Sequence, residues 1–507
     1  MMGQGLDTSA DRPGLDADVI VVGAGPSGMT AATELAEAGC SVIVLDMQSA
    51  PGGQIYRGLE ANVEDEGVTH ELLAALGGSY REGLALIRKF RAARSIRYHG
   101  LTTVWEVRPD GTVGWLRGKD AGYLRARHVL LAHGAMERPT PFVGWTLPGV
   151  MSAGAVQTLL KVGRMKPAGR VVLAGTGPLI FLLAAQLRRL GVKPVLIART
   201  DRFADRAVAT RHLRPAAAVA VVKGIMWLAQ LRFAGVRMAS GISRLEASGK
   251  ERVEAVRYAV GDRTFTQACD LLIVHDGIVP SVDLPVSAGL TLEWDGANAN
   301  WRPRTNSDGA ATATNSDGAP DQPSSIRVTG DARRIAGADA AIAHGRIAAR
   351  AILTDLKRAG RVDGGDADTA MRRATAARPF LDAAFPPGLS ALPIDDGTIV
   401  CRCEELSAGD LRESIRGGVT DINLLRAETR CGMGPCQGRS CMVTVARLIT
   451  EVGADPKAAS VFRGRPPARP LPLGALAKMS GLDPRTAQLI TLDDKPDAGE
   501  ATYAPAS

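Results

Sequence analysis

Five of the seven cysteines of this 507-residue chain lie close together in the last quarter of its sequence. They form the pattern Cys401-x-Cys403, followed by a glycine-rich run that contains Cys431, Cys436 and Cys441. Thiols clustered in this way, without the features of a secreted disulfide scaffold, favour a metal centre. Four thiolates suit a [2Fe–2S] cluster, which is therefore the predicted centre.

The predicted ligands are Cys401, Cys403, Cys436 and Cys441, and Cys431 is the alternative to Cys436. In an extended segment, residues two apart point to the same side, so Cys401 and Cys403 can reach one centre. Zinc is the rival metal. Its sites usually contain Cys-x2–4-Cys pairs, which the Cys401-x-Cys403 opening fits less well.

A second chemical motif lies near the N-terminus, where an apolar run ends in Gly23-x-Gly25-x-x-Gly28. Residues 27–38 then read as a helix, and a second apolar run ends on Asp46. This order is the signature of a dinucleotide-binding βαβ unit, with the pyrophosphate at the helix N-terminus. The carboxylate at the end of the second strand would accept hydrogen bonds from the adenosine ribose.

A second copy of the motif begins at Gly175-x-Gly177, but Ile180 stands where the third glycine belongs. The branched side chain would push the helix off the strand. Arg199 replaces the acid at the end of the next strand and could accommodate a 2′-phosphate. We expect a second Rossmann-like fold whose nucleotide site has lapsed or been repurposed, with NAD(P)H binding as the alternative.

The pair Gly330-Asp331 ends a predicted strand just before an alanine-rich helix. In a flavin domain that is split in the sequence, this carboxylate would accept from a ribityl hydroxyl; simple N-capping of the helix is the alternative. Residues 296–325 precede the pair and repeat Thr-Asn-Ser-Asp-Gly-Ala. Their polar composition predicts a disordered insertion.

The composition is that of a globular protein, with 45% hydrophobic and 22% charged residues. The net charge of +8 is spread along the chain, so we expect no nucleic-acid partner. Residues 1–16 are polar, which favours the cytoplasm. Residues 216–236 are apolar but interrupted by Lys223 and Arg232, so they predict a buried helix and no transmembrane segment, with membrane-surface contact as the alternative.

Together, these motifs resemble the α-subunit family shared by hydrogen cyanide synthase, the opine oxidases and D-hydroxyproline dehydrogenase. The resemblance is carried by residues 51–57, Glu137-Arg138-Pro139, residues 144–149, Gly330-Asp331 and the cysteine pattern. It implies that FAD is held by Gly23, Gly25, Pro26, Ser27, Gly28, Asp46, Gly53, Gln54, Arg57, Gly134, Gly330 and Asp331. No catalytic residue is assigned.

The predicted fold is α/β. It has two Rossmann-like dinucleotide-binding domains of the pyridine nucleotide-disulfide oxidoreductase type, and a small α-rich iron–sulfur domain similar to bacterioferritin-associated ferredoxin. The predicted parts are 17–150 and 265–357 for the FAD domain, 151–264 for the second Rossmann-like domain, 358–392 for a linker, 393–455 for the [2Fe–2S] domain and 456–507 for a tail.

The resemblance implies the electron-transfer α-subunit of a heteromeric dehydrogenase or oxidase that acts on a secondary amine or imino acid, such as D-hydroxyproline or an opine. Its implied partners are an FAD-containing β-subunit similar to amino-acid oxidases, a further small iron–sulfur subunit, and a quinone or other acceptor. Attachment to the inner membrane through this complex is the alternative to a purely cytoplasmic location.

Three alternative functions remain at this stage. One is a stand-alone NAD(P)H-dependent reductase of ferredoxin-like acceptors, and another is a hydrogen cyanide synthase-type subunit that oxidises glycine. The third is an iron–sulfur sensor or assembly module. No closely spaced pair of cysteines lies between residues 47 and 260, so a disulfide reductase would lack its redox dithiol.

Overall fold

The computed structural model describes residues 14–65, 70–312, 323–358, 364–453 and 461–479. Its first sheet has eight strands, in the order β19-β20-β6-β1-β2-β3, with β5 and β4 joined to β6. The strands are β1 Ala17–Val22, β2 Val42–Leu45, β3 Ile96–His99, β4 Thr102–Val107, β5 Thr112–Arg117, β6 Asp120–Leu131, β19 Ala310–Thr312 and β20 Pro323–Val328.

Strand β1 lies in the middle of this sheet and pairs in parallel with β2 and β6. Val19 and Val21 belong to the core on one face, and Ile20 and Val22 to the core on the other. A strand buried on both faces reads as a continuous apolar run, which is why the N-terminal motif was recognisable. Its helices include α1 Pro26–Glu37, α2 Leu59–Glu64, α3 His70–Leu76, α4 Gly78–Arg81, α5 Gly83–Ala92 and α11 Ala338–Asp355.

The second sheet is a five-stranded parallel sheet, in the order β11-β10-β9-β15-β8. Its strands are β8 Val150–Ser152, β9 Val171–Gly175, β10 Leu196–Arg199, β11 Arg237–Ser240 and β15 Leu271–His275. The helices of this domain are α6 Ala153–Lys161, α7 Pro178–Arg189, α8 Phe203–Ala209 and α9 Ala218–Phe233, with an antiparallel sheet of β12 Ile242–Ser248, β13 Ala255–Val260 and β14 Arg263–Ala268. The second Rossmann-like fold predicted from the sequence is confirmed.

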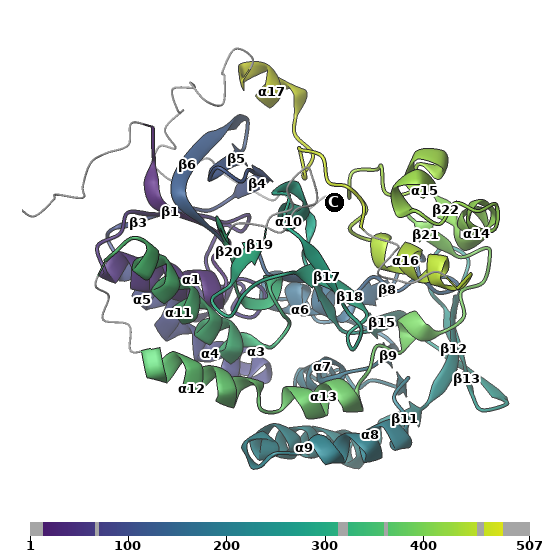
Figure 1. Cartoon of the computed structure of the whole chain (residues 1–507). Coiled ribbons are helices and arrows are strands. Elements are labelled where there is room, and N and C mark those ends of the chain that lie inside the picture. Colours follow the sequence, from purple (N-terminus) through teal and green to yellow (C-terminus); the bar gives the residue numbers. More distant parts are fainter. Residues whose placement is uncertain (1–13, 66–69, 313–322, 359–363, 454–460, 480–507) are drawn as a thin grey trace, which may run out of the picture.

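The C-terminal domain is small and mostly helical, as predicted, and has a hydrophobic core of its own (Figure 1). It contains β21 Ile399–Cys401, β22 Leu406–Ser407, α14 Ala408–Arg416, α15 Ile422–Thr429 and α16 Met442–Thr450. Helix α14 begins with a capping box, in which Ser407 and Asp410 satisfy each other's backbone N–H groups.

The prediction of disorder over residues 296–325 is wrong where this segment is described. Strands β17 Leu292–Asp295 and β18 Asn300–Pro303 form a hairpin, and β19 joins the first sheet. Trp294 and Trp301 pack with their ring centroids 5.3 Å apart, and Trp301 is buried. These two indoles supply apolar burial that the composition of the segment concealed; residues 313–322 lie outside the described part.

The predicted linker and tail are also folded where they are described. The linker contains α12 Gly364–Thr375, α13 Arg378–Ala384 and the short 3-10 helix η4 Leu389–Ala391. The tail contains α17 Leu473–Met479, which packs against the first domain, and Phe462, which joins the core of the cluster domain. The polar composition hid short apolar segments that fill gaps between domains. The domain boundaries themselves stay a prediction.

We predict that Gly345→Ala destabilises the flavin domain. Gly345 lies where α11 crosses α1, and a Cβ atom there would lie 2.4 Å from the carbonyl oxygen of Ser27. Overpacking of this kind costs about 1–3 kcal/mol. The matched control is Gly224→Ala in α9, where a Cβ atom meets nothing within 4 Å and should stabilise the helix by about 1 kcal/mol.

The measurement is the temperature at which flavin is released from the purified protein. The expected order of release temperatures is Gly345→Ala below the parent protein and Gly224→Ala at or above it. Equal release temperatures for Gly345→Ala and the parent would contradict the close packing of α1 against α11.

Candidate functional site

The turn between β1 and α1 admits only glycine at two of its positions. Gly23 has a φ of 103°, and a Cβ atom there would lie 2.5 Å from the carbonyl oxygen of Ala132. A Cβ atom at Gly28 would lie 2.0 Å from the carbonyl oxygen of Gly23. The start of α1 therefore packs directly on the strand, with its free N–H groups directed toward the edge of the sheet where a pyrophosphate binds.

A loop that follows β2 closes over this turn. A Cβ atom at Gly53 would lie 2.7 Å from the Cα atom of Gly25, so the two backbones touch. Lys161, at the end of α6, holds the loop because its Nζ donates to the carbonyl oxygens of Gln54 and Ile55 at 3.1 and 3.0 Å. Burial, with the nearby charge of Arg57 as a smaller cause, lowers the pKa of Lys161 to about 8.

Two buried carboxylates lie at the ends of strands around this turn. Asp46 accepts from the backbone N–H groups of Ala24 and Gln48, and Asp331 accepts from that of Ala336 at 3.0 Å. Burial raises the pKa of both carboxyls, and these backbone hydrogen bonds oppose the shift. Further donors such as ribose and ribityl hydroxyls would favour the ionised carboxylates, so both positions fit the sugar alcohols of FAD.

The predicted flavin residues gather around one cavity of about 840 Å³, a volume typical of a site for a large cofactor. Every one of them lines it except Gly28, which serves the packing of α1. Among the described residues, the buried Nε of Arg57 has no hydrogen-bond partner. An unpaired guanidinium N–H beside a glycine-lined turn suits a phosphate oxygen, so this donor set fits FAD.

Several polar residues of this cavity were not predicted as site residues. Glu137 accepts from His275 Nδ1 at 2.6 Å, its other oxygen accepts from the N–H of Gly154, and both side chains line the cavity. Arg138 is buried and donates only to backbone carbonyls, including those of Asp276 and Asn298.

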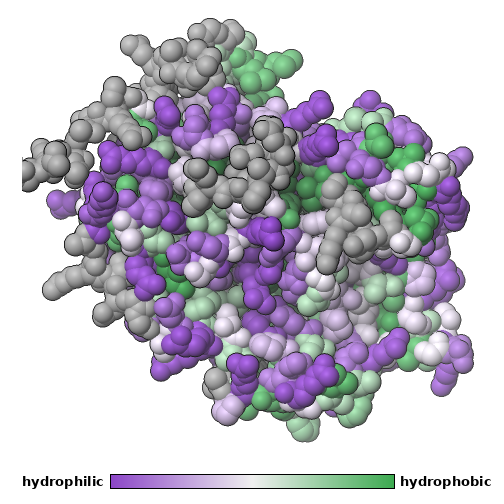
Figure 2. Space-filling model, viewed as in Figure 1, coloured by the Kyte–Doolittle hydropathy of each residue, from purple (hydrophilic) through white to green (hydrophobic). Residues whose placement is uncertain are grey.

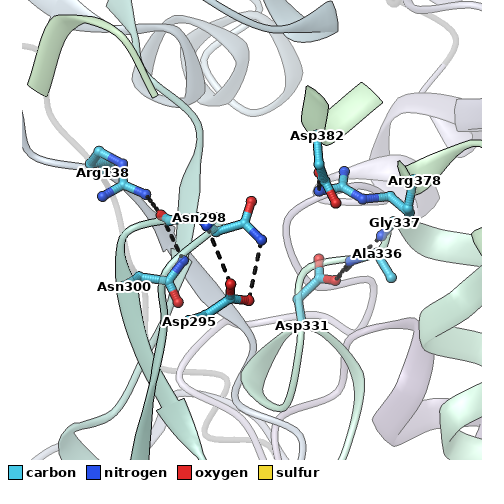
Figure 3. Close-up of polar contacts among 9 residues, drawn as sticks. All are labelled: Arg138, Asp295, Asn298, Asn300, Asp331, Ala336, Gly337, Arg378 and Asp382. Atoms are coloured by element: carbon cyan, nitrogen blue, oxygen red, sulfur yellow. Dashed lines mark hydrogen bonds and ion pairs between the residues drawn. The ribbon is translucent and has the colours of Figure 1, made fainter. Parts of the chain in front are cut away.

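Figure 3 shows Asn298, next to Arg138, on one side of this cavity and Asp331 with the Arg378–Asp382 pair on the other. Arg378 and Asp382 lie on α13, in the predicted linker, so no sequence signal pointed to them. Glu137 and Arg138 were visible as the residues that follow the exit from the sheet, but nothing in the sequence indicated that they face the flavin site.

The second dinucleotide motif is covered by a segment from far along the chain. Asp276, directly after β15, accepts from the backbone N–H groups of Gly388, Leu389 and Ser390 at 2.7–2.8 Å. Its neighbour Leu389 reaches within 3.1 Å of where a Cβ atom of Gly175 would lie. This 388–392 segment lies at the edge of the sheet where a bound dinucleotide would lie.

Arg199 does not fit the role of a 2′-phosphate ligand. It is buried and forms an ion pair with the buried Asp201, and its guanidinium lies 5.0 Å from the ring centroid of Phe181. A charge already satisfied in this way gains little from a phosphate. Beside it, a Cβ atom at Gly388 would lie 2.1 Å from the Thr200 hydroxyl oxygen, so the 388–392 segment is in close contact with the end of β10.

The five clustered cysteines lie in two groups. Cys401, Cys431 and Cys441 are buried, with their Sγ atoms all within 4.8 Å of one another. Cys403 and Cys436 form the second group and interact through backbone and thiol. Cys431 therefore competes with Cys441 for a place in the cluster, whereas the sequence suggested competition with Cys436.

The position of Cys441 favours it over Cys431 as a ligand. Cys441 is the N-cap of α16, where the helix dipole stabilises a thiolate. Cys431 can donate its S–H to Cys441 Sγ at 3.8 Å. These contacts fit a centre held by Cys401, Cys403, Cys436 and Cys441, with Cys431 as a hydrogen-bond donor to a ligand; the assignment stays a prediction.

The cluster loop is shaped by Phe462, from the segment predicted as a tail. Cβ atoms at Gly432 and Gly438 would lie 2.8 and 2.3 Å from its ring. A Cβ atom at Gly434 would lie 2.2 Å from Cys403 Cβ. The glycines thus let an aromatic ring and a cysteine pack directly on the loop, a role that their number alone did not indicate.

A split flavin domain, a second Rossmann-like domain and a clustered-thiol domain together define an FAD- and [2Fe–2S]-containing oxidoreductase. Residues 17–310 match the model of the pyridine nucleotide-disulphide oxidoreductase family, and residues 399–451 match the BFD-like [2Fe-2S] binding domain. The chain belongs to the pyridine nucleotide-disulphide oxidoreductase family, and within it to the group formed by HcnB and the corresponding subunits of the opine oxidases.

The relatives cover almost the whole chain. The corresponding opine oxidase subunit of Agrobacterium tumefaciens is 38% identical over 93% of this chain and 93% of its own length. Hydrogen cyanide synthase subunit HcnB of Pseudomonas aeruginosa is 30% identical over 91% and 98%, respectively. The crystal structure of L-proline dehydrogenase from P. horikoshii shares the fold, with a TM-score of 0.64 and 20% identity over 91% of this chain and 79% of that one.

We predict that serine replacements separate the ligands from the fifth thiol. Cys401→Ser, Cys403→Ser, Cys436→Ser and Cys441→Ser should lose most of the cluster absorption, because each removes one of four thiolate ligands. Cys431→Ser should retain the cluster with a shifted potential, because it removes only a hydrogen bond to sulfur. Iron content and visible absorption are measured, with the buried Cys269→Ser as the control.

Loss of the cluster in Cys431→Ser together with its retention in Cys441→Ser would reverse the assignment of these two residues. Retention in all five variants would mean that no cysteine of this group is required. Flavin content, measured alongside, identifies variants that simply fail to fold.

We predict that Lys161 gives flavin retention a specific dependence on pH. An unfolded lysine has a pKa near 10.4, so between about pH 8 and 10.4 the unfolded chain binds a proton that folded Lys161 lacks. This residue's contribution to stability therefore rises with pH through that window. Flavin-release temperatures of Lys161→Met, compared with the parent at pH 7 to 10, should lack this contribution; identical pH profiles would contradict the low pKa.

Proposed function

We propose that the chain is the electron-transferring α-subunit of a heteromeric dehydrogenase or oxidase that acts on a secondary amine or imino acid, such as D-hydroxyproline or an opine. One observation carries the proposal: the flavin cavity and the cluster loop are separated by a single strand. Met136, in β7 Ala135–Glu137, lines the flavin cavity and also a smaller cleft against residues Gln437–Arg439 of the cluster loop.

When bound, FAD supplies acceptance of an electron pair, and a [2Fe–2S] cluster supplies the transfer of single electrons. The chain contributes the positions of these two groups. Strand β7 pairs with β16 Ile278–Pro280, and residues of both strands face the cleft beside the cluster loop. Arg138 adds a buried positive charge at the flavin cavity, which favours negative charge there.

Two other entry routes for electrons are disfavoured by this chain's own residues. Outside the cluster, its only cysteines are Cys40 and Cys269, which are buried in different cores, so no redox dithiol faces the flavin. The 388–392 segment lies over the second dinucleotide motif, which disfavours NAD(P)H. The remaining route is electron transfer from a partner subunit.

The relatives support a subunit role, because their names describe them as subunits of opine oxidase and hydrogen cyanide synthase. We therefore propose that the substrate is bound by a partner, an FAD-containing β-subunit similar to amino-acid oxidases. The complex would also include a quinone or other acceptor and, as an option, a further small iron–sulfur subunit. An opine or imino acid is preferred over glycine, because identity to the opine oxidase subunits is higher than identity to HcnB.

The test is anaerobic spectroscopy of the chain alone and of the chain purified with an amino-acid-oxidase-like partner. Addition of D-hydroxyproline or an opine to the complex should bleach the flavin absorption and produce the signal of a reduced [2Fe–2S] cluster. Addition of NADH or NADPH to the chain alone should leave the flavin oxidised for minutes.

Each contrary outcome has a separate meaning. Rapid bleaching of the isolated chain by NADPH would make it a stand-alone reductase. Reduction by glycine alone among the substrates would assign the hydrogen cyanide synthase type of reaction. A preparation that holds the cluster but no stoichiometric flavin would indicate a sensor or assembly module.

A further inference from the structure

Helix α9 is apolar on both of its sides, although only one side is buried in the protein. Leu231 is fully buried, and Trp227 and Leu228 pack against the core beside α7. At 100° per residue, Leu231 lies opposite the side formed by Val222, Met226 and Phe233. The sequence predicted a buried helix here, and this prediction holds for the inner side only.

The outer side of α9 is exposed and apolar. Val222, Ile225, Met226 and Phe233 follow the spacing that places residues on one helix face, and Phe233 is 93% exposed. Phe203, the first residue of the neighbouring α8, is 80% exposed, and Val208 of the same helix is also exposed. Figure 2 shows hydrophobic surface at the lower edge of the molecule, where Figure 1 places these two helices.

Basic side chains border this α8–α9 face. Lys223 and Arg232 lie about 90° to either side of the apolar stripe on α9, and both are exposed. Arg211 and Arg214, between the two helices, are exposed as well. From residue 202 to residue 237 the one acid is Asp205, which caps α8.

We propose that the α8–α9 face binds the surface of an anionic lipid bilayer. An apolar stripe with basic residues along both edges is the pattern of a helix that lies in the interfacial plane, with its apolar side chains among the acyl chains and its cations at the lipid phosphates. No helix among the described residues is long and apolar enough to cross a membrane, so the contact is with the surface.

The charge distribution is what favours a bilayer over a protein partner. A protein interface of this size would combine apolar contacts with matched donors and acceptors, whereas the outer side of α9 presents four apolar side chains in succession along one face. A row of cations that lacks neighbouring acids is matched by a uniformly anionic surface. The proposal is independent of the substrate and of the electron-transfer role.

The experiment is co-sedimentation of the full-length, flavin- and cluster-loaded chain with vesicles of phosphatidylcholine alone or with one quarter phosphatidylglycerol. The parent protein should sediment with the anionic vesicles and release at high salt. Phe233→Ser with Ile225→Ser should reduce binding more than about tenfold, because two apolar anchors are lost. Lys223→Glu should reduce it about fivefold or more.

Two matched controls make the same changes elsewhere. Leu424→Ser replaces a side chain of α15 that is 64% exposed, and Lys119→Glu reverses a charge in the turn between β5 and β6. Both controls should bind like the parent. Flavin content and reduction of an artificial dye are measured for every variant, and unchanged values show that it is folded.

Several results would overturn the proposal. One is a parent protein that stays in the supernatant with anionic vesicles at low salt. Another is equal binding by the Phe233→Ser, Ile225→Ser variant and the parent. If this variant instead loses co-purification with a partner subunit while vesicles bind neither protein, the face is a protein interface.

Discussion

The carboxylate of Asp276 is the group on which the arrangement of the domains depends. It accepts three consecutive backbone N–H groups from the 388–392 segment, and Arg447 of α16 donates to the carbonyl oxygens of Ser390 and Leu392 on the same segment. Hydrogen bonds to charged groups are the stronger kind, and these are partly shielded from water. One short segment therefore fixes the cluster domain to the second Rossmann-like domain.

This attachment has two consequences at once. It places the cluster loop beside Met136, at the wall of the flavin cavity, and it covers the edge of the second sheet where a dinucleotide would bind. A single structural change thus accompanies both the addition of an electron exit and the loss of an electron entry. Trp145, whose Nε1 donates to the carbonyl oxygen of Ile399 at 2.7 Å, holds the start of the cluster domain at a second point.

The parts that could be predicted from the sequence are those whose chemistry is local. Gly23, Gly28 and Asp46 act within one βαβ unit, and their spacing revealed both the fold and the cavity. The Asp276 contact joins residues more than a hundred positions apart, and α13 brings Arg378 to the flavin cavity from a stretch that reads as a linker. No periodicity or motif encodes such contacts, because they depend on how separately folded units pack.

The two proposed surfaces constrain the path of the electrons. Figure 1 places α8 and α9 at the lower edge of the molecule and the cluster domain at the upper right, so the two lie well apart. With the α8–α9 face on a bilayer, the cluster would be held away from the lipid. Because electron transfer requires closeness, the cluster would then pass electrons to another protein-bound group first, and a quinone dissolved in the bilayer would be reduced only through that carrier.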